Sequence, residues 1–350
     1  MTTAVCRLLV VILAMLLPAA VWAARSPAKE AERRFRAGWS RFQLSVAIPH
    51  SALVKPVDVL TMRQEAIREM QTAVALRPRD PQFLESLGYL HAEDLNPLLA
   101  AKWYLRAAEA DPRQPRVFYL LAQSYAALIE PKTPGAPAAC ARAAETYDRA
   151  LRLDSHNGLL LLESAEIYHR AGLDAEAARR LERGLDHIYY RLYTLPAPAD
   201  LALEGGNPAA AWFGLQEHFW SKALSAAHAL AQWSVSLGRD AEKEGRRSLA
   251  ETHYQHAVTI GLNLTRAEPK TVATVLVGLR CQELGLGPLA AMDKASRRSA
   301  DNERLERVRA GIQAALSELA SPTAATSVQA LLGSQASAAE RILAVMEGKP

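Results

Sequence analysis

The chain has 350 residues, of which 50% are hydrophobic and 22% are charged. This apolar fraction excludes global disorder, and the length suffices for two ordinary domains or for one elongated array. The 41 basic and 37 acidic side chains leave a net charge of +4, which is too small to indicate a nucleic-acid partner. The chain holds 66 alanines and only 6% aromatic residues, a balance that favours helices and argues against an all-β fold.

The N-terminus has the pattern of a secretory signal. Arg7 precedes an apolar stretch, residues 8–24, that contains Pro18 and ends in small residues. This order of charge, apolar core and small residues predicts a signal peptide over residues 1–23, cleaved after Ala23, and hence a protein of the bacterial periplasm or cell envelope. The alternative is an uncleaved anchor in the inner membrane, because seventeen apolar residues reach the lower limit of a spanning helix.

Two cysteines remain once the signal is removed, Cys140 and Cys281. They lie 141 positions apart, and no CxxC motif or Cys/His cluster accompanies them. An oxidising compartment permits a disulfide, but we favour two separate buried thiols. The sequence therefore predicts no zinc site, no haem attachment and no other cofactor.

A repeat of 34 residues runs through the first half of the chain. Its clearest unit, residues 81–114, has large apolar residues at positions 4, 7 and 24, small residues at 8, 20 and 27, and proline at 32. In chain order these residues are Leu84, Leu87, Gly88, Ala100, Tyr104, Ala107 and Pro112. The small residues let two helices approach closely, the large ones fill the remaining space, and the proline ends the second helix.

The pattern returns in two further units, residues 115–157 with a proline-rich insertion near residues 130–138, and residues 158–190 without one. The matching residues are Phe118, Leu121, Ala122, Tyr125, Ala143, Tyr147 and Ala150, then Leu161, Ala165, Tyr168, Ala177, Leu181 and Gly184. The second half of the pattern also occurs upstream, at Ala66, Met70, Ala73 and Pro78. The corresponding first half would be the helix around Trp39 and Phe42.

This pattern resembles the tetratricopeptide repeat (TPR) family, whose units are pairs of antiparallel helices that stack into a superhelix. The resemblance covers residues 60–190 well and residues 30–60 loosely. It implies an all-α, TPR-like α-solenoid over residues 24–192, with a concave groove that binds extended peptides or helices.

The resemblance also implies which positions line that groove, namely 2, 5, 9 and 12 of each unit. The residues that we expect to contact a peptide are Gln82, Glu85, Tyr89, Arg116, Tyr119, Gln123, Leu162, Glu166 and His169. The tyrosines offer contact area and a hydrogen-bonding group at low entropic cost. Glu85, Tyr89, Tyr119 and Gln123 depart from the Lys, Arg and Asn pattern with which one branch of the family clamps a C-terminal carboxylate, which argues against a chaperone-tail clamp.

The second half is helical but less regular, and residues 193–208, rich in proline and glycine, predict a linker and domain boundary. A degenerate TPR-like helical region would then span residues 209–320. Residues 209–237 are apolar and predict one long buried helix or two tight ones, followed by a turn at 238–245. Residues 246–265 repeat the 20, 24 and 27 spacing, with Ala250, Tyr254 and Ala257.

The C-terminal residues predict a hairpin, a cap and a tail. Residues 270–284 and 288–297 would form a helical hairpin across the sequence GLGP. Residues 299–319 form a charged amphipathic pattern suited to a terminal cap. The Ala- and Ser-rich tail, residues 321–350, would end in a short helix at 337–347.

No catalytic motif accompanies these elements, since the chain has no nucleophile elbow, no H-E-x-x-H and no P-loop. Glu166 and His169 form a single E-x-x-H, whereas di-iron bundles use that motif twice, so we interpret it as a solvated helix face. His253 and His256 lack a third metal ligand. Asn263 begins an N-glycosylation pattern inside a predicted helix, which we interpret as a chance match.

Two basic patches, Arg33-Arg34 with Arg36 and Arg297-Arg298, alternate with acidic residues. Such alternation predicts solvated helix faces. If the signal stays uncleaved, the first patch would lie beside the membrane and contact anionic lipid.

Three functional hypotheses follow. The leading one is a non-catalytic scaffold that binds a peptide or protein partner in the groove of residues 81–190. The second is an assembly scaffold that forms homo-oligomers through the apolar residues 209–237. The third is an enzyme with a site between the two halves, for which Glu217, His218 and His228 are candidates although no mechanism follows from them. None of the three calls for nucleic acid, and membrane contact is expected only with an uncleaved signal.

Overall fold

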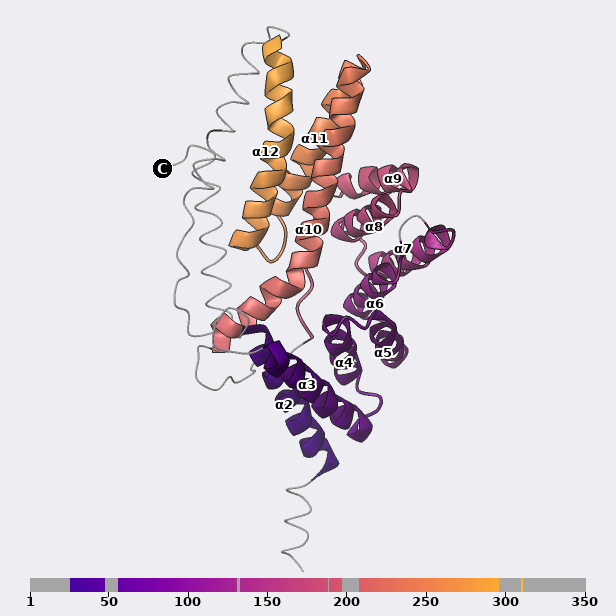
Figure 1. Cartoon of the computed structure of the whole chain (residues 1–350), viewed down its shortest axis with the longest axis vertical. Coiled ribbons are helices and arrows are strands. Elements are labelled where there is room, and N and C mark those ends of the chain that lie inside the picture. Colours follow the sequence, from indigo (N-terminus) through magenta and orange to yellow (C-terminus); the bar gives the residue numbers. More distant parts are fainter. Residues whose placement is uncertain are drawn as a thin grey trace, which may run out of the picture. The chain divides into compact units, whose positions relative to one another are not determined.

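The structure is a computed structural model, and it describes residues 26–47, 56–130, 133–187, 189–196, 208–295 and 310. Within these residues the chain forms eleven α-helices, α2 to α12, and isolated β-bridges in place of strands (Figure 1). The predicted all-α class is confirmed. Most of the helix contacts join helices that follow one another in the chain. The predicted signal and tail helix lie outside the described residues, and of the predicted cap only Ala310 is described, as an exposed helical residue.

The chain divides into two compact units. Unit 1 holds the described residues up to Pro112 together with Pro196, and unit 2 holds the described residues from Arg113 to Leu195 and from 208 to 295. The division therefore falls inside the predicted array and not in the stretch 193–208, where the sequence predicts it. The reason is that residues 189–195 belong to the core of unit 2.

Unit 1 contains two helix pairs, α2–α3 and α4–α5. Their bounds are α2 Pro27–Ala47, α3 Pro56–Leu76, α4 Pro81–Glu93 and α5 Pro97–Ala110. Each of these helices begins at a proline, whose fixed φ suits the first turn and whose missing N–H costs nothing there. The helix around Trp39 and Phe42 is α2, and it packs on α3 where Gly38 faces Met70.

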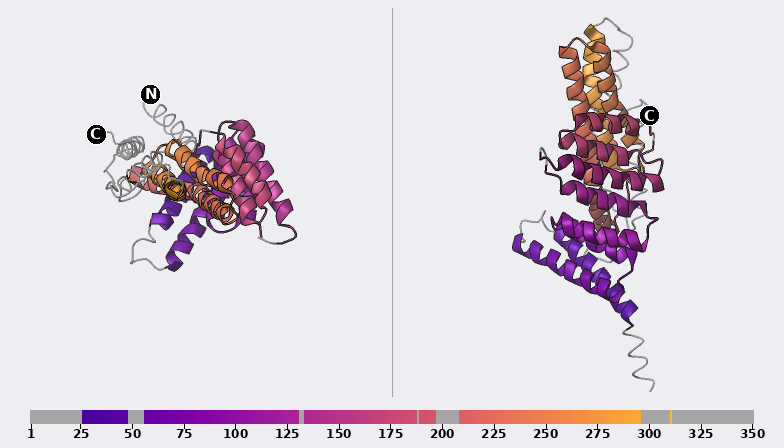
Figure 2. Two further views of the ribbon diagram at one scale, coloured as in Figure 1. Left: turned by 90° about the horizontal axis from the view of Figure 1, so that it is seen from above. Right: turned by 90° about the vertical axis from the view of Figure 1, so that its right-hand side faces the viewer.

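Unit 2 contains seven helices in its described residues. Their bounds are α6 Pro115–Ala127, α7 Ala136–Leu153, α8 Leu159–Arg170, α9 Asp174–Leu185, α10 Pro208–Lys243, α11 Arg247–Thr265 and α12 Val272–Ala295. The pairs α6–α7 and α8–α9 are the second and third repeats, and they stack through α7 and α8 (Figure 2). A half-buried two-point ion pair links α9 to α7, since the two terminal nitrogens of Arg180 each lie 2.9 Å from a carboxylate oxygen of Asp148.

A glycine opposite a tyrosine ring sets the spacing of one helix pair in each unit. In unit 1 a Cβ on Gly88 would lie 2.7 Å from the ring of Tyr104, and in unit 2 a Cβ on Gly238 would lie 2.5 Å from the ring of Tyr254. Each tyrosine follows its glycine by sixteen residues, as positions 8 and 24 of the repeat require. The end of α10 is therefore the first helix of the degenerate repeat around Tyr254.

This packing explains why only the end of the stretch 238–245, residues 244 and 245, forms the predicted turn. Gly238 serves helix contact, so α10 continues as one helix of 36 residues to Lys243. The chain reverses at Gly245, whose φ of 75° lies in the region that glycine alone adopts freely.

The hairpin predicted across the sequence GLGP is wrong, because α12 runs through it without a break. Gly285 lies against the backbone of Tyr254 in α11 and does not form a turn. Pro288 lies inside the helix, although proline cannot donate an intrahelical hydrogen bond there.

The apolar run 209–237 supplies core to unit 2. From Leu215 onward most of its large apolar side chains are buried, among them Phe219, Trp220 and Leu230. No helix in the described part of the chain has both the length and the apolar character needed to cross a membrane.

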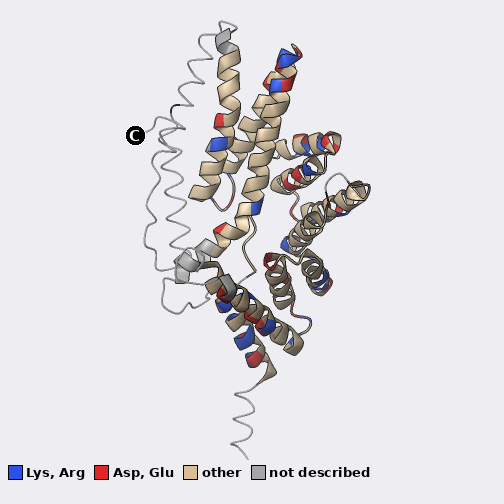
Figure 3. Ribbon diagram, viewed as in Figure 1, with Lys and Arg blue, Asp and Glu red and all other residues tan. Residues whose placement is uncertain are grey.

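The charges lie mainly on the other helices, and α12 is largely uncharged (Figure 3). On α2 the basic residues pair with acidic neighbours, as the sequence predicts for a solvated face. Arg34 lies 2.8 Å from both Glu30 and Glu69, and Arg36 lies 3.0 Å from Glu32. Arg297 and Arg298 fall outside the described residues.

Candidate functional site

An extended segment, residues 189–195, follows α9 and lies in the interior of unit 2; we call it the strap. Four of its side chains are buried, those of Tyr190, Leu192, Tyr193 and Leu195. Its backbone forms parallel bridges with Asn157 and Glu268. The sequence assigned residues from 193 onward to a linker, and this is wrong for Tyr193 and Leu195, which are part of the core.

Two amide side chains hold the backbone of the strap. Asn157 accepts from the N–H of Arg191 (3.0 Å) and donates to its carbonyl (2.9 Å). Gln216 accepts from the N–H of Leu195 (2.7 Å) and donates to the carbonyl of Tyr193 (3.2 Å). Both amides are fully buried. A side-chain amide that pairs with both backbone groups recognises an extended chain whatever side chains it carries.

The inner face of α6 contacts the strap through two predicted groove residues. The ring of Tyr119 lies 5.2 Å from that of Tyr193. Arg116 donates to the carbonyl and the hydroxyl of Thr194, at 3.1 and 3.2 Å. The positions that the repeat presents to a peptide therefore contact an extended segment of the chain itself.

The Tyr193 side chain ends on a carboxylate. Its hydroxyl donates to Oδ2 of Asp154 at 3.0 Å. Burial and the charge of Asp154 raise the pKa of Tyr193 above its usual range, so the phenol keeps its proton. Trp220 adds a second anchor, since its indole N–H donates to the Tyr193 carbonyl at 2.7 Å.

A buried carboxyl group, that of Glu163, lies on α8 next to Tyr119. Gln123 donates both to Tyr119 Oη (2.6 Å) and to Glu163 Oε2 (3.0 Å), and Tyr147 donates to the same oxygen at 3.2 Å. Oε1 of Glu163 has no hydrogen-bond partner among the described residues. Burial raises the pKa of Glu163 to about 7, against the hydrogen bonds, which lower it.

The predicted groove residues differ in their exposure to solvent. Gln82 is exposed, but Glu85, Tyr89, Tyr119 and Leu162 are buried, so the expectation of a solvent-lined groove does not hold at these four positions. Leu162 is buried because it packs between the paired helices, next to Gly184 of α9. Tyr119 is buried partly because the strap covers it.

The E-x-x-H pair has separate partners. The ring of His169 stacks on Trp233 of α10 at 4.4 Å, and its Nδ1 lies 2.8 Å from Asp174. Glu166 lies 3.9 Å from Arg170. Across the described ranges, no three His, Cys, Asp or Glu side chains are grouped to hold a metal ion.

The residues proposed for an enzyme lie on α10. Glu217 is half-buried, which raises its pKa, and His218 is exposed. Nδ1 of His228 lies 3.9 Å from the sulfur of Cys281, and burial raises the pKa of that thiol to about 12. Such a thiol stays protonated and is not a nucleophile.

Three other residues match their interpretation from sequence. Cys140 and Cys281 are separate, buried thiols. Asn263 is buried and donates to the carbonyl of His187 at 3.0 Å, so it is no surface glycosylation acceptor.

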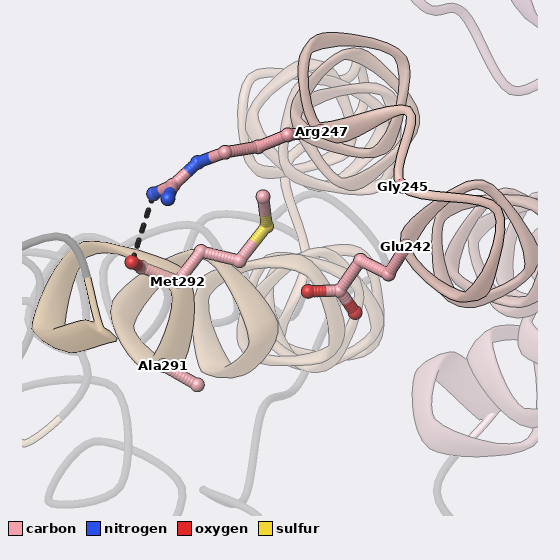
Figure 4. Close-up of a pocket in the computed structure, with 5 residues that line it drawn as sticks. All are labelled: Glu242, Gly245, Arg247, Ala291 and Met292. Atoms are coloured by element: carbon pink, nitrogen blue, oxygen red, sulfur yellow. Dashed lines mark hydrogen bonds between the residues drawn. The ribbon is translucent and has the colours of Figure 1, made fainter.

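A cavity of about 300 Å³ lies where the α10–α11 turn meets α12 (Figure 4). It is lined by Glu242, Gly245, Arg247, Ala291 and Met292. Its charged groups are engaged within unit 2: Arg247 donates to the Met292 carbonyl at 2.8 Å, and Glu242 accepts from Tyr254 at 2.5 Å. We assign no ligand to it.

Sequence reasoning missed the residues that hold the strap, Asp154, Asn157, Gln216 and Trp220. One signal was available, because Gln216 is a polar residue within the apolar run 209–237. Asn157 lies in a turn between repeats, where polar residues are ordinary and carry no such signal.

No protein-family model matches the chain, and no curated protein matches it. Among solved structures, the crystal structure of MamA is similar, with 14% sequence identity and a TM-score of 0.36, over 59% of this chain and 95% of that one. A likeness at this level carries no argument about function.

Proposed function

We propose that the protein is a non-catalytic scaffold that binds an extended segment of a partner protein in the groove of unit 2, by which we mean the place that the strap occupies beside Arg116, Tyr119, Asn157 and Gln216. The observation that carries this proposal is the strap, an extended segment held in that groove through its backbone by Asn157 and Gln216. A groove that binds an extended chain in cis has the donors and acceptors to bind one in trans.

The proposal can be tested by selecting binders from a library of random twelve-residue peptides. The bait is the Tyr193→Ala variant, which loosens the strap and leaves Asn157 and Gln216 in place. We expect selected peptides to bind it at micromolar concentrations and to lose about tenfold or more in affinity when Gln216→Ala is added, because two backbone hydrogen bonds disappear. Fluorescence anisotropy measures both affinities.

The matched control is Gln255→Ala, on the exposed face of α11, which should leave the affinity unchanged. Failure to select any peptide with a correctly folded bait would contradict the proposal. So would peptides that bind equally well with and without Gln216.

We further propose that this scaffold works in the bacterial cell envelope, to which residues 1–23 direct it. Support comes from the charge, apolar core and small-residue order of that segment. Expression of the full chain in a bacterium should yield periplasmic protein whose intact mass corresponds to a chain that starts at Ala24. A membrane-bound product that retains residues 1–23 would indicate the anchor instead, and a cytoplasmic product would rule out export.

A further inference from the structure

We infer that the groove of unit 2 selects a tyrosine in the partner segment, at the place now held by Tyr193, and that the strap competes for this place in cis. The inference rests on the proposed function, because it names the chemistry of the segment that the groove accepts.

The place held by Tyr193 fits an aromatic ring. The side chain is only 8% exposed, and its ring lies 5.2 Å from that of Tyr119. Tyr119 is itself flanked by the rings of Tyr147 and Phe219, at 6.1 and 6.3 Å. A partner segment with alanine at this position would leave a cavity lined by aromatic rings. The free energy lost by leaving such a cavity would weaken its binding.

The far end of this place fits a hydroxyl donor. Oδ2 of Asp154 accepts from the phenol at 3.0 Å, and the same oxygen accepts from the amide of Asn157 at 3.2 Å. Because Asn157 also holds the backbone at Arg191, the acceptor and the backbone clamp are fixed relative to one another. A phenylalanine lacks the donor, and a phosphotyrosine would set its negative charge against Asp154.

The next residue on the strap, Thr194, contributes less to selectivity. Thr194 is exposed, and Arg116 contacts its carbonyl as well as its hydroxyl. The backbone on either side of Tyr193 is held by Asn157 and Gln216. Among the buried side chains of the strap, Tyr190, Leu192, Tyr193 and Leu195, the one whose surroundings combine aromatic rings with a carboxylate acceptor is Tyr193.

Competition from the strap should lower the apparent affinity of the groove for a partner segment. The strap is part of the same chain, so its effective concentration at the groove is high, in the millimolar range or above. A partner segment binds only to the fraction of molecules in which the strap has left, and its apparent affinity falls by that fraction. Weakening the strap should therefore strengthen binding in trans.

The test uses four fluorescent peptides with the sequence of residues 189–196, carrying tyrosine, phenylalanine, alanine or phosphotyrosine at the fifth position. Each is titrated by anisotropy against the wild-type protein and the Tyr193→Ala variant. On the variant we expect phenylalanine to bind about tenfold more weakly than tyrosine, and alanine and phosphotyrosine at least a hundredfold more weakly. We expect the tyrosine peptide to bind the variant at least tenfold more tightly than the wild type.

The outcomes separate the two levels of the proposal. If all four peptides bind the variant equally, the selection of tyrosine is overturned and the proposed function stands. If none binds, the proposed function fails as well. If wild type and variant bind the tyrosine peptide equally, the competition in cis is overturned. Should circular dichroism show that Tyr193→Ala does not fold, Tyr193→Phe loosens the strap by one hydrogen bond, and the same peptide order applies.

Discussion

Gly285→Ala should destabilise the protein by about 3 kcal/mol or more, although alanine is the better helix former. A Cβ at position 285 would lie 2.4 Å from the carbonyl oxygen of Tyr254 and 2.8 Å from a methyl group of Val258. The first of these neighbours is backbone, so relief requires α12 to move away from α11.

The same two helices also pack closely at Gly261 and Gly278. A Cβ on Gly261 would lie 2.3 Å from the carbonyl oxygen of Gly278, and a Cβ on Gly278 would lie 2.7 Å from that of Gly261. Separating the helices at Gly285 therefore also opens the contact at Gly261 and Gly278, and the lost dispersion adds to the cost.

The control for this prediction is Gly287→Ala, two residues further along α12. Apart from the adjacent residues and the backbone of its own helix turn, no atom of the described residues lies within 4 Å of a Cβ built there. Helix propensity favours alanine by about 1 kcal/mol, and the restriction that Pro288 imposes on the preceding residue opposes this, so the net change should stay within about 1 kcal/mol. Urea denaturation followed by far-ultraviolet circular dichroism measures both variants. Equal effects would contradict the packing role assigned to Gly285.

These glycines mark a limit of what the sequence predicts. The repeat frame placed Gly88 at a packing position, opposite the tyrosine sixteen residues downstream. Gly238 has the same spacing to Tyr254, but the sequence assigned it to a turn. Gly285 has no such partner in sequence, and beside Pro288 it has the composition of a turn. What shows that Gly285 is a packing glycine is its contact with α11. This contact depends on tertiary structure and cannot be deduced from the local sequence.

The candidate site was predictable in part, for a similar reason. The repeat frame predicted that Arg116 and Tyr119 contact a bound peptide; in the structure they contact the strap, a segment of the same chain, and binding of a partner there stays a prediction. It could not identify the strap as the occupant, because the contact between Tyr193 and Asp154 joins residues 39 positions apart and follows from no periodicity. Proline and glycine from 196 to 208 marked an end of regular helix, and that signal does not separate an exposed linker from an extended buried segment.

The sequence also could not predict that the carboxyl group of Glu163 is buried. Glu163 occupies position 6 of its repeat, where the other units have Ser86 and Leu120, so the frame assigns it no carboxylate role. The structure surrounds it with Tyr119, Tyr147 and Gln123. A buried acid of this kind has a measurable signature.

Glu163→Gln should change how the stability of the protein depends on pH. The pKa of Glu163 is about 7 in the folded chain and near its ordinary 4.5 when unfolded. A raised pKa means that the folded state binds the proton more tightly, so this contribution to stability is fully present below pH 4.5 and is lost as the pH rises towards 7. The shift corresponds to a loss of up to about 3 kcal/mol.

Because glutamine stays neutral, the Glu163→Gln variant should escape this loss. At pH 8 it should be more stable than the wild type, and at pH 4.5 the advantage should vanish or reverse. Urea denaturation at several pH values, followed by circular dichroism, measures the difference in unfolding free energy between the two proteins.

The difference between the two proteins is the informative quantity, since the wild-type profile alone mixes several groups. Burial lowers the pKa of His91, His228, His253 and His256, and these groups favour folding as the pH rises, opposite in sign to Glu163. They are present in both proteins and cancel in the difference. Glu145→Gln, an exposed change on α7, is the matched control and should give no pH-dependent difference. A Glu163→Gln difference that stays flat from pH 4.5 to 8 would show that Glu163 is ionised in the folded protein, and the desolvation argument at this site would then be wrong.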